Sequence, residues 1–273
     1  MTDPLIRVTG LYKVYGANPQ SVMPMVRDGR SKDDILAETG HTVGLRDITL
    51  AIESAEVFVV MGLSGCGKST LLRHFNRLIE PTEGTIHVGD TDVMGLSQSE
   101  LETFRQHKMS MVFQRFGLLP HRSVLQNVAF GLMIQKQPKA ACEEKAREWL
   151  RAVGLDGYED QYPAQLSGGQ QQRVGLARAL CTDPDILLMD EAFSALDPLI
   201  RSEMQDQLID LQGRLKKTIV FITHDLDEAI RIGDRIAILK DGGISQVGTP
   251  NEILDNPADD YVAAFVRDVK RSR

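Results

Sequence analysis

The chain has few cysteines, few aromatic residues and no long hydrophobic run. Its 273 residues include three cysteines, Cys66, Cys142 and Cys181, which are odd in number and scattered. They cannot form a disulfide framework, and none has a typical metal-binding partner nearby in the sequence. A disulfide-rich secreted domain and a cysteine-based metal site are therefore disfavoured. We expect small buried thiols in a protein of a reducing compartment.

Membrane spans and nucleic-acid contacts are not indicated either. No stretch approaches the roughly 18 apolar residues that a membrane-spanning helix needs. The N-terminal Met1–Pro4 does not begin a charged segment followed by an apolar one, so we expect no signal peptide. With a net charge of −7 the chain lacks the basic character of a nucleic-acid-binding surface, and we expect no nucleic-acid partner.

Short β-branched runs alternate with longer helical patterns along the chain. This alternation predicts an α/β fold with a largely parallel sheet. The clearest expected strands are Ile86–Val88, Met109–Phe113, Ile186–Met189, Thr218–Thr223 and Arg235–Leu239. The segment Glu143–Val153 is typical of a helix, which Gly154 would end as its C-terminal cap.

A glycine-rich segment between Val57–Met61 and Leu71 has the strand, loop and helix order of a phosphate-binding loop. Glycines let backbone N–H groups turn inward, and the helix adds the positive end of its dipole. Lys68 would bridge the β- and γ-phosphates of a nucleotide, and the Ser69 hydroxyl would bind Mg²⁺. The residues expected to contact ATP here are Gly62, Leu63, Ser64, Gly65, Cys66, Gly67, Lys68, Ser69 and Thr70.

Two carboxylates end the apolar run Ile186–Met189. Ligands of open α/β sheets bind at the carboxyl ends of the strands. Asp190 would contact Mg²⁺ through water, and Glu191 would act as the general base on an attacking water. Taken alone, this pattern describes a solvated strand end equally well.

A second anion-binding pattern lies in Leu166–Arg173. Ser167, Gly168 and Gly169, followed by Gln170, can offer a hydroxyl and bare N–H groups at a helix start. One nucleotide cannot contact both glycine segments of one copy if they lie on different lobes. We therefore expect a head-to-tail homodimer, in which each ATP lies between the glycine loop of one copy and the Ser-Gly-Gly turn of the other. In isolation, these residues also describe a glycine-rich helix cap.

The spacing of these motifs suggests a single domain over residues 1–273. Residues 101–165 are rich in helical patterns and lie between the phosphate-binding segments. We expect them to form a helical lobe inserted into a core of about 1–100 and 166–250, with a C-terminal tail at 251–273.

Residues 17–43 are less regular and form an expected insertion before the core. Ser31 followed by Asp34 favours a helix start, and Gly40 favours the end of that helix. We therefore expect a short surface helix within the insertion.

In this order and spacing, the motifs resemble those of ABC transporter ATPases over nearly the whole chain. Gly62–Thr70 is similar to the Walker A motif, Leu166–Gln170 to the signature and Ile186–Glu191 to Walker B. Further matches are the Q-loop residue Gln114, the D-loop Ser194–Asp197 and the switch residue His224. The resemblance implies a P-loop NTPase with a RecA-like core, an inserted helical subdomain and a small N-terminal antiparallel sheet, hydrolysing ATP with Mg²⁺.

The resemblance also implies roles for single residues. Gln114 would contact Mg²⁺ and the attacking water and would connect the nucleotide to membrane subunits. His224 would contact the γ-phosphate, although a lone histidine after a strand is more often structural. Asp197 would shape the dimer interface. Tyr15 would stack on adenine, with Tyr12 as the competing aromatic, and either residue could instead belong to a core.

Several segments resemble, more narrowly, the ATPases of glycine betaine and proline importers for quaternary amines. These are Phe75–Pro81, Met111–Gln114, Phe116–His121, Asp190–Asp206 and the insertion 17–43. Many members of this subfamily carry paired CBS regulatory modules after the motor, and we expect none here because the chain stops at Arg273. Ala55 takes a position that is usually glycine, where we expect a small local backbone change.

Such an importer implies two transmembrane permease subunits and a separate substrate-binding protein, with this chain peripheral at the cytoplasmic face of the inner membrane. Only 5% of the residues are aromatic, which leaves little for the aromatic cage that binds quaternary ammonium groups. The alternatives are an importer for another small solute, such as a polar amino acid, and a non-transport ABC ATPase. A P-loop kinase or GTPase is disfavoured because Leu166–Gln170 would have no role there.

Overall fold

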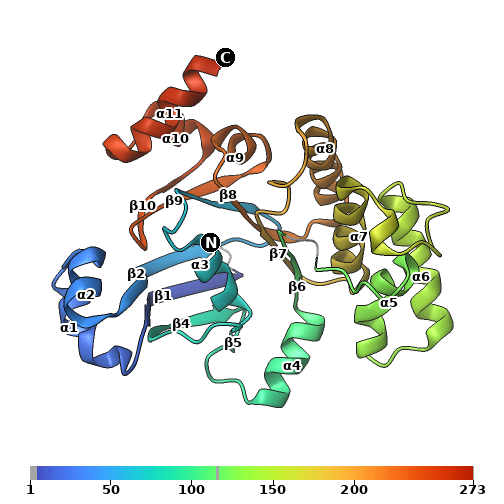
Figure 1. Ribbon diagram of the computed structural model, residues 1–273, viewed down its shortest axis with the longest axis horizontal. Coiled ribbons are helices and arrows are strands. Elements are labelled where there is room, and N and C mark those ends of the chain that lie inside the picture. Colours follow the sequence, from blue (N-terminus) through green and yellow to red (C-terminus); the bar gives the residue numbers. More distant parts are fainter. Residues whose placement is uncertain (1–4, 115–116, 273) are drawn as a thin grey trace. The chain divides into compact units, whose positions relative to one another are not determined.

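The protein forms two compact units. The computed structural model describes residues 5–114 and 117–272, and Figure 1 shows its helices and strands. One unit comprises Met1–Leu101 together with Ile222–Arg273, and the other comprises Glu102–Phe221. The expected division into a catalytic core and an inserted helical lobe stays a prediction.

Some sequence-based expectations involve residues outside the described ranges. Met1–Pro4 belong to the expectation that there is no signal peptide. Phe116 belongs to the segment Phe116–His121, which resembles quaternary-amine importers, and Arg273 ends the expected C-terminal tail. Within the described ranges, none of the helices combines the length and the apolar character that crossing a bilayer requires.

The first unit contains a four-stranded antiparallel sheet in the order β2-β1-β4-β5. Its strands are β1 (Ile6–Tyr15), β2 (Thr42–Ile52), β4 (Glu83–Val88) and β5 (Thr91–Asp92). Strands β1 and β2 pair from Ile6↔Ile52 to Tyr15↔Thr42, so the insertion between them leaves and re-enters the sheet at one end. The predicted N-terminal antiparallel sheet is confirmed.

The strand before the glycine loop, β3 (Val57–Met61), is buried along its whole length and pairs in parallel with β9 (Arg235–Lys240). After β9, a turn at Asp241 and Gly242 leads into antiparallel β10 (Gly243–Gly248). Both turn residues have positive φ, +48° and +82°, which suits a two-residue hairpin. The helices that follow the strands of this unit are α3 (Lys68–Phe75), α9 (Leu226–Ile232), α10 (Pro250–Asp255) and α11 (Asp260–Ser272).

The insertion between β1 and β2 has a small core of its own. A 3-10 turn (Pro19–Val22) leads into α1 (Met23–Arg27) and α2 (Lys32–Thr39). The side chain of Ser31 caps the start of α2, and Gly40 ends it with φ of +71°, so the predicted helix is confirmed. The apolar side chains that pack together here are Val14, Val22, Met23, Val26, Ile35 and Val43.

The second unit combines strands with a group of helices. In the sheet order, β7 (Ile186–Asp190) lies between β6 (Met109–Val112) and β8 (Thr218–Thr223), and it runs parallel to β6. The helices are α4 (Gln98–His107), which begins in the first unit, α5 (Val124–Ile134), α6 (Lys139–Ala152), α7 (Gly168–Cys181) and α8 (Pro198–Leu215).

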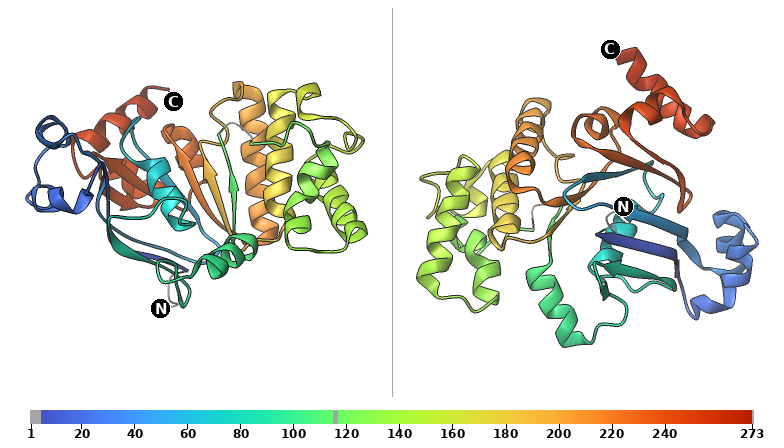
Figure 2. Two further views of the ribbon diagram at one scale, coloured as in Figure 1. Left: turned by 60° about the horizontal axis from the view of Figure 1, so that its bottom comes forward. Right: turned by 180° about the vertical axis from the view of Figure 1, so that it is seen from behind.

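Helices α5, α6 and α7 pack against one another around an apolar core and lie side by side in Figure 2, from light green to gold. Cys142 and Cys181 belong to this core, and Cys66 is buried in the first unit. Burial raises the pKa of the Cys181 thiol to about 12, so it stays protonated at neutral pH. The expectation of small buried thiols is confirmed for all three cysteines.

Five elements differ from their predicted bounds. Among them, β4 begins at Glu83 instead of Ile86, β7 ends at Asp190 instead of Met189, and β9 ends at Lys240 instead of Leu239. The strand β6 ends at Val112, one residue earlier than predicted. The helix predicted from Glu143 begins at Lys139, directly after Pro138. Its first turn is largely exposed, so the hydrophobic pattern could not reveal it.

Ala55 has the left-handed backbone conformation, with φ of +62°, in the turn before β3. The Cβ atom makes this conformation unfavourable by roughly 1–2 kcal/mol. Alanine therefore occupies a backbone geometry that glycine adopts readily. The expected change relative to glycine-containing relatives stays a prediction.

His74 is fully buried on α3. Its Nδ1 lies 2.6 Å from the carbonyl oxygen of Thr70, whereas its Nε2 is buried and has no hydrogen-bond partner in the described part of the chain. Burial lowers the pKa of His74 to about 4, because a charged ring would lose its hydration there.

We expect the protein to lose stability as the pH falls from about 6.5 towards 4 because of His74. The unfolded chain binds a proton at His74 in this range and the folded chain does not, so acid favours unfolding. The loss reaches about 3 kcal/mol, at roughly 1.4 kcal/mol per pKa unit. Urea unfolding at about pH 7.5 and about pH 4.5 checks it against His74→Gln, which lacks the titrating ring. The gap in unfolding free energy between the two proteins should change with pH; a constant gap contradicts the prediction.

Candidate nucleotide-binding site

The glycine loop between β3 and α3 has the backbone conformation that only glycine adopts easily. Gly62 and Gly67 have φ of +147° and +108°. A Cβ on Gly62 would lie 2.3 Å from the carbonyl oxygen of Leu239, and one on Gly67 would lie 2.6 Å from that of Gly44. Both positions therefore require glycine for two reasons, the backbone torsion and the close approach of β9 and β2.

Neighbouring elements hold the outside of the loop. The backbone N–H of Gly242, in the β9–β10 turn, donates to the carbonyl oxygen of Cys66 over 3.1 Å. The backbone N–H of Leu63 donates to the hydroxyl of Tyr261 on α11 over 3.2 Å. Ser64 and Gly65 remain exposed at the tip of the loop.

Lys68 is the first residue of α3 and is only 5% exposed. Its Nζ donates to the carbonyl oxygens of Gly62 and Leu63 over 2.9 and 3.2 Å. Ser69 and Thr70 follow in the first turn, and the N-terminus of a helix favours anions through its dipole. The predicted loop residues therefore form a continuous cradle at a helix N-terminus.

Tyr15 ends β1 with 39% of its surface exposed. Its hydroxyl lies 3.4 Å from the Thr70 hydroxyl, and the Lys13 Nζ lies 4.9 Å from its ring centroid. The competing Tyr12 packs against the small core of the insertion instead. Of the two candidate tyrosines, Tyr15 is therefore the one with an accessible ring next to the glycine loop.

His41, at the end of the insertion, was not singled out by sequence reasoning. Its Nε2 lies 2.6 Å from the carbonyl oxygen of Ala17, and its Nδ1 lies 3.0 Å from that of Thr39. The ring also packs on Gly16, where a Cβ would lie 2.4 Å from it. One imidazole thus connects the two ends of the insertion. The end that it contacts at Ala17 begins two residues after Tyr15.

In the second unit, the predicted carboxylates stand at the end of β7. Asp190 is 5% exposed, and Glu191 follows with φ of +45°, an unusual value for a residue with a side chain. The Nε2 of Gln114 donates to Glu191 Oε2 over 3.2 Å and to Ser194 Oγ over 3.3 Å. The structure therefore brings Gln114 to Glu191 and Ser194, which lie 77 and 80 residues further along the chain.

The Ser-Gly-Gly turn is the N-terminus of α7. Ser167 is the N-cap: its Oγ accepts from the N–H of Gln170, and the Gln170 side chain accepts from the N–H of Ser167. Ser167 and Gly168 are exposed, and a Cβ on Gly169 would lie 2.7 Å from Ile200. Ser167 therefore caps the helix, as the helix-cap interpretation of this sequence requires. The anion-binding role of the same residues stays a prediction.

Asp197 and His224 occupy the two remaining predicted positions. Asp197 is the N-cap of α8, where its Oδ1 accepts from the N–H of Ile200 over 3.1 Å. His224 is exposed directly after β8, and the neighbouring Asp225 caps α9. Asp197 thus has a structural use as well, and the following Pro198 is the sequence signal that could have indicated it.

The two units divide the predicted residues. Tyr15, the glycine loop and His224 belong to the first unit, and the others belong to the second. Among the described residues, no group of three or more histidine, cysteine or acidic side chains could hold a metal ion. The hydroxyl, carboxylate and amide oxygens of Ser69, Asp190 and Gln114 are the donor types that suit Mg²⁺, which keeps several waters.

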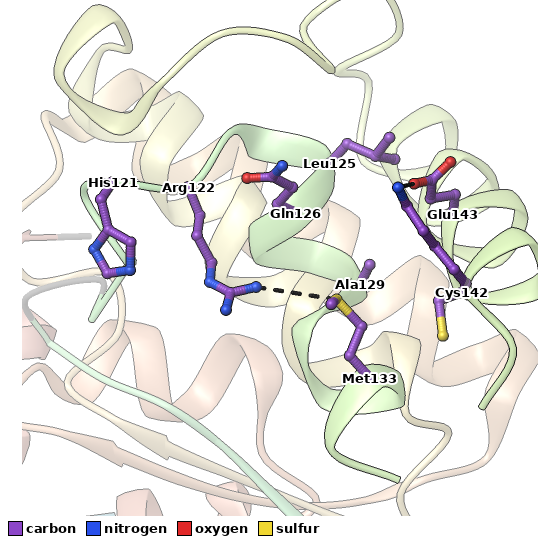
Figure 3. A pocket seen from close by; sticks show the side chains of 9 residues that line it. His121, Arg122, Leu125, Gln126, Ala129, Met133, Cys142 and Glu143 are labelled. Atoms are coloured by element: carbon purple, nitrogen blue, oxygen red, sulfur yellow. Dashed lines mark hydrogen bonds and ion pairs between the residues drawn. The ribbon is translucent and has the colours of Figure 1, made fainter. Parts of the chain in front are cut away.

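A pocket of about 470 Å³ opens between α5 and α6 (Figure 3). The Arg122 guanidinium points across it towards Met133, and Lys139 forms an ion pair with Glu143 over 3.6 Å. His121 and Gln126 line the pocket as well. Its mixed apolar and charged lining differs from the backbone-lined glycine cradle.

Comparison with known proteins identifies close relatives. The ABC transporter family model matches residues 45–194. A glycine betaine/carnitine transport ATP-binding protein of Listeria monocytogenes is 56% identical over 98% of this chain and 68% of its own length. A glycine betaine/proline betaine transport system ATP-binding protein of Escherichia coli is 55% identical over 98% of this chain and 67% of its own length. The chain thus spans about two thirds of the length of these two relatives.

A trimethylamine N-oxide transport system ATP-binding protein of Ruegeria pomeroyi is 51% identical over 100% of this chain and 80% of its own length. Among solved structures, a dimeric ATP-binding cassette in a post-hydrolysis state, bound to ADP and Pi, is 31% identical with a TM-score of 0.76. That match covers 90% of this chain and 98% of the other. The predicted P-loop NTPase fold is therefore confirmed, and the chain belongs to the ABC transporter family as an ATP-binding subunit.

Proposed function

We propose that this ABC-type ATPase hydrolyses ATP with Glu191 as the general base and Mg²⁺ as the cofactor. The observation that carries the proposal is the Gln114–Glu191 contact at the end of β7, since it joins the base to the residue that orients water and Mg²⁺. The Asp190 carboxylate and the Ser69 hydroxyl are the groups that would hold Mg²⁺, which would neutralise charge on the phosphates. Lys68 moves from the loop carbonyls to the β- and γ-phosphates, and His224 contacts the γ-phosphate.

The nucleotide lies between two copies of the chain. The glycine loop of one copy binds the phosphates, while Ser167, Gly168 and Gly169 of the other offer a hydroxyl and the N-terminus of α7. Tyr15 stacks on adenine, and Asp197 lines the interface beside its capping bond. The related solved cassette is dimeric with ADP and Pi, which supports this arrangement.

The importer served by this motor carries glycine betaine or a related quaternary amine. Support comes from the transport functions of the relatives, which are 51% to 56% identical to this chain over the matched residues. Two permease subunits and a separate binding protein complete the assembly, with the ATPase at the cytoplasmic face of the membrane. An importer of another small solute is the second candidate, because the cargo contacts none of the residues described above.

The pocket between α5 and α6 is the surface that meets the permease. The pocket lies in the same compact unit as Gln114. A displacement of Gln114 when nucleotide binds can therefore be transmitted to the pocket within that unit. The exposed Met133 and Ile134, 42% and 47% accessible, supply apolar area at the end of α5.

Replacing Glu191 by Gln should slow ATP hydrolysis by on the order of 10²–10⁴-fold, because the amide cannot take the proton of the attacking water. ATP binding should persist, since the phosphate cradle is unchanged. Single-turnover hydrolysis and equilibrium nucleotide binding measure the two effects, with Glu144→Gln on the exposed face of α6 as the control. Turnover near wild type in Glu191→Gln would remove Glu191 from the proposed role.

The Glu191→Gln protein should dimerise when ATP and Mg²⁺ are added, and Ser167→Asp should weaken this dimer by more than about tenfold. Aspartate keeps the N-cap of α7 but opposes the phosphates with a like charge. Ser167→Asn is the matched control, because it caps the helix without charge. Light scattering after size exclusion gives the oligomeric state, and an equally strong dimer in Ser167→Asp rules out the shared site.

Glycine betaine should stimulate ATP turnover when the subunit is assembled with its permease and binding protein in liposomes. A polar amino acid tested in parallel should not, because it lacks the quaternary ammonium group. Stimulation by the amino acid instead would select the second candidate function.

In the same liposomes, Met133→Glu should reduce the stimulation, since the charge would be buried against the permease. Leu36→Glu, at an exposed apolar residue of the insertion, is the control. Equal stimulation of the wild type, Met133→Glu and Leu36→Glu would exclude the pocket as the permease contact.

A further inference from the structure

The hydroxyl of Tyr261 forms hydrogen bonds to two backbone segments, one at the start of the glycine loop and one in β9. It accepts a hydrogen bond from the N–H of Leu63 over 3.2 Å and donates one to the carbonyl oxygen of Leu239 over 3.1 Å. Leu63 lies 198 residues from Tyr261 in the sequence, and Leu239 lies 22 residues from it. One hydroxyl on α11 therefore connects the glycine loop to the end of β9.

Several contacts fix the position of this hydroxyl. Asp259 caps α11 by accepting from the N–H of Val262 over 2.8 Å, and it also accepts from the Ser245 hydroxyl on β10 over 2.9 Å. The Tyr261 ring packs edge-on against Phe265, with centroids 5.2 Å apart, and the Lys240 Nζ lies 5.1 Å from its centroid. Burial raises the pKa of Tyr261, so the phenol keeps the proton that it donates to Leu239.

Lys68 contacts the same part of the loop, the two consecutive residues Gly62 and Leu63, here called the Gly62–Leu63 step. Lys68 donates from inside the loop to the carbonyl oxygens of Gly62 and Leu63, while Tyr261 binds the N–H of Leu63 from outside. The Leu239 carbonyl that accepts from Tyr261 is also the one that lies closest to Gly62. When Lys68 turns to the phosphates, the Gly62–Leu63 step loses both inner hydrogen bonds, and the bonds through Tyr261 remain.

We propose that Tyr261 is a positioning residue for the phosphate-binding loop, whose hydroxyl keeps the Gly62–Leu63 step in place while Lys68 binds the nucleotide. The inference rests on the proposed function, because it assigns Lys68 to the phosphates. The inference concerns the binding of the phosphates and not of the adenine ring, because Leu63, which Tyr261 contacts, belongs to the phosphate-binding loop. The hydroxyl itself touches neither the nucleotide nor the attacking water.

The test is Tyr261→Phe in the full chain, which removes one oxygen and keeps the ring packing on Phe265. The Kd values of Mg·ATP and of inorganic tripolyphosphate with Mg²⁺ should both rise roughly two- to tenfold, as expected when the loop loses its hydrogen bond to Tyr261 and the hydroxyl also releases Leu239. Turnover at saturating ATP should stay unchanged, so that KM moves and kcat does not. Tyr158→Phe, a half-buried tyrosine of the second unit, is the matched control.

The melting temperature separates positioning from packing. Tyr261→Leu, which also removes the ring, should lower the melting temperature more than Tyr261→Phe and raise the Kd of tripolyphosphate by a similar factor. Unchanged Kd values in Tyr261→Phe, or a lower melting temperature with unchanged tripolyphosphate binding, would overturn the inference. If the wild-type chain itself binds neither Mg·ATP nor tripolyphosphate, the proposed function fails instead.

Discussion

A phosphate-binding loop must turn its backbone N–H groups inward, so its outer surface has to be held by other parts of the protein. Here the loop rests on β9 through Gly62 and on β2 through Gly67, at distances that leave no space for a Cβ atom. The turn after β9 and the helix α11 add hydrogen bonds to Cys66 and Leu63. The nucleotide site of the first unit is therefore a product of close backbone packing.

The end of β7, in the second unit, depends on a different constraint. Glu191 keeps a side chain in the left-handed backbone region, at a cost of order 1–3 kcal/mol that the surrounding fold must offset. Such strain is common where a side chain has to point in one direction. In this direction the Glu191 carboxylate accepts a hydrogen bond from Gln114, which follows the neighbouring strand β6.

Two additions surround the nucleotide residues of the first unit. Near the end of the insertion, His41 contacts the backbone of Ala17 and of Thr39, the last residue of α2, and packs on Gly16, which follows Tyr15 in the sequence. The C-terminal helix reaches the glycine loop through Tyr261. Both use hydrogen bonds to backbone atoms, so each restrains the main chain next to a predicted ligand contact without replacing that contact.

The sequence by itself determined the glycine loop, the paired carboxylates after β7, the Ser-Gly-Gly helix start and the capped helix of the insertion. Each is a local pattern, in which the chemistry and the backbone requirement lie within a few consecutive residues. Only the tertiary structure decided which aromatic is accessible, that Gln114 meets Glu191, and that His41 and Tyr261 support the site. Their partners are 77, 24 and 198 residues away for Gln114, His41 and Tyr261, and no local pattern encodes a hydrogen bond to a distant backbone atom or side chain.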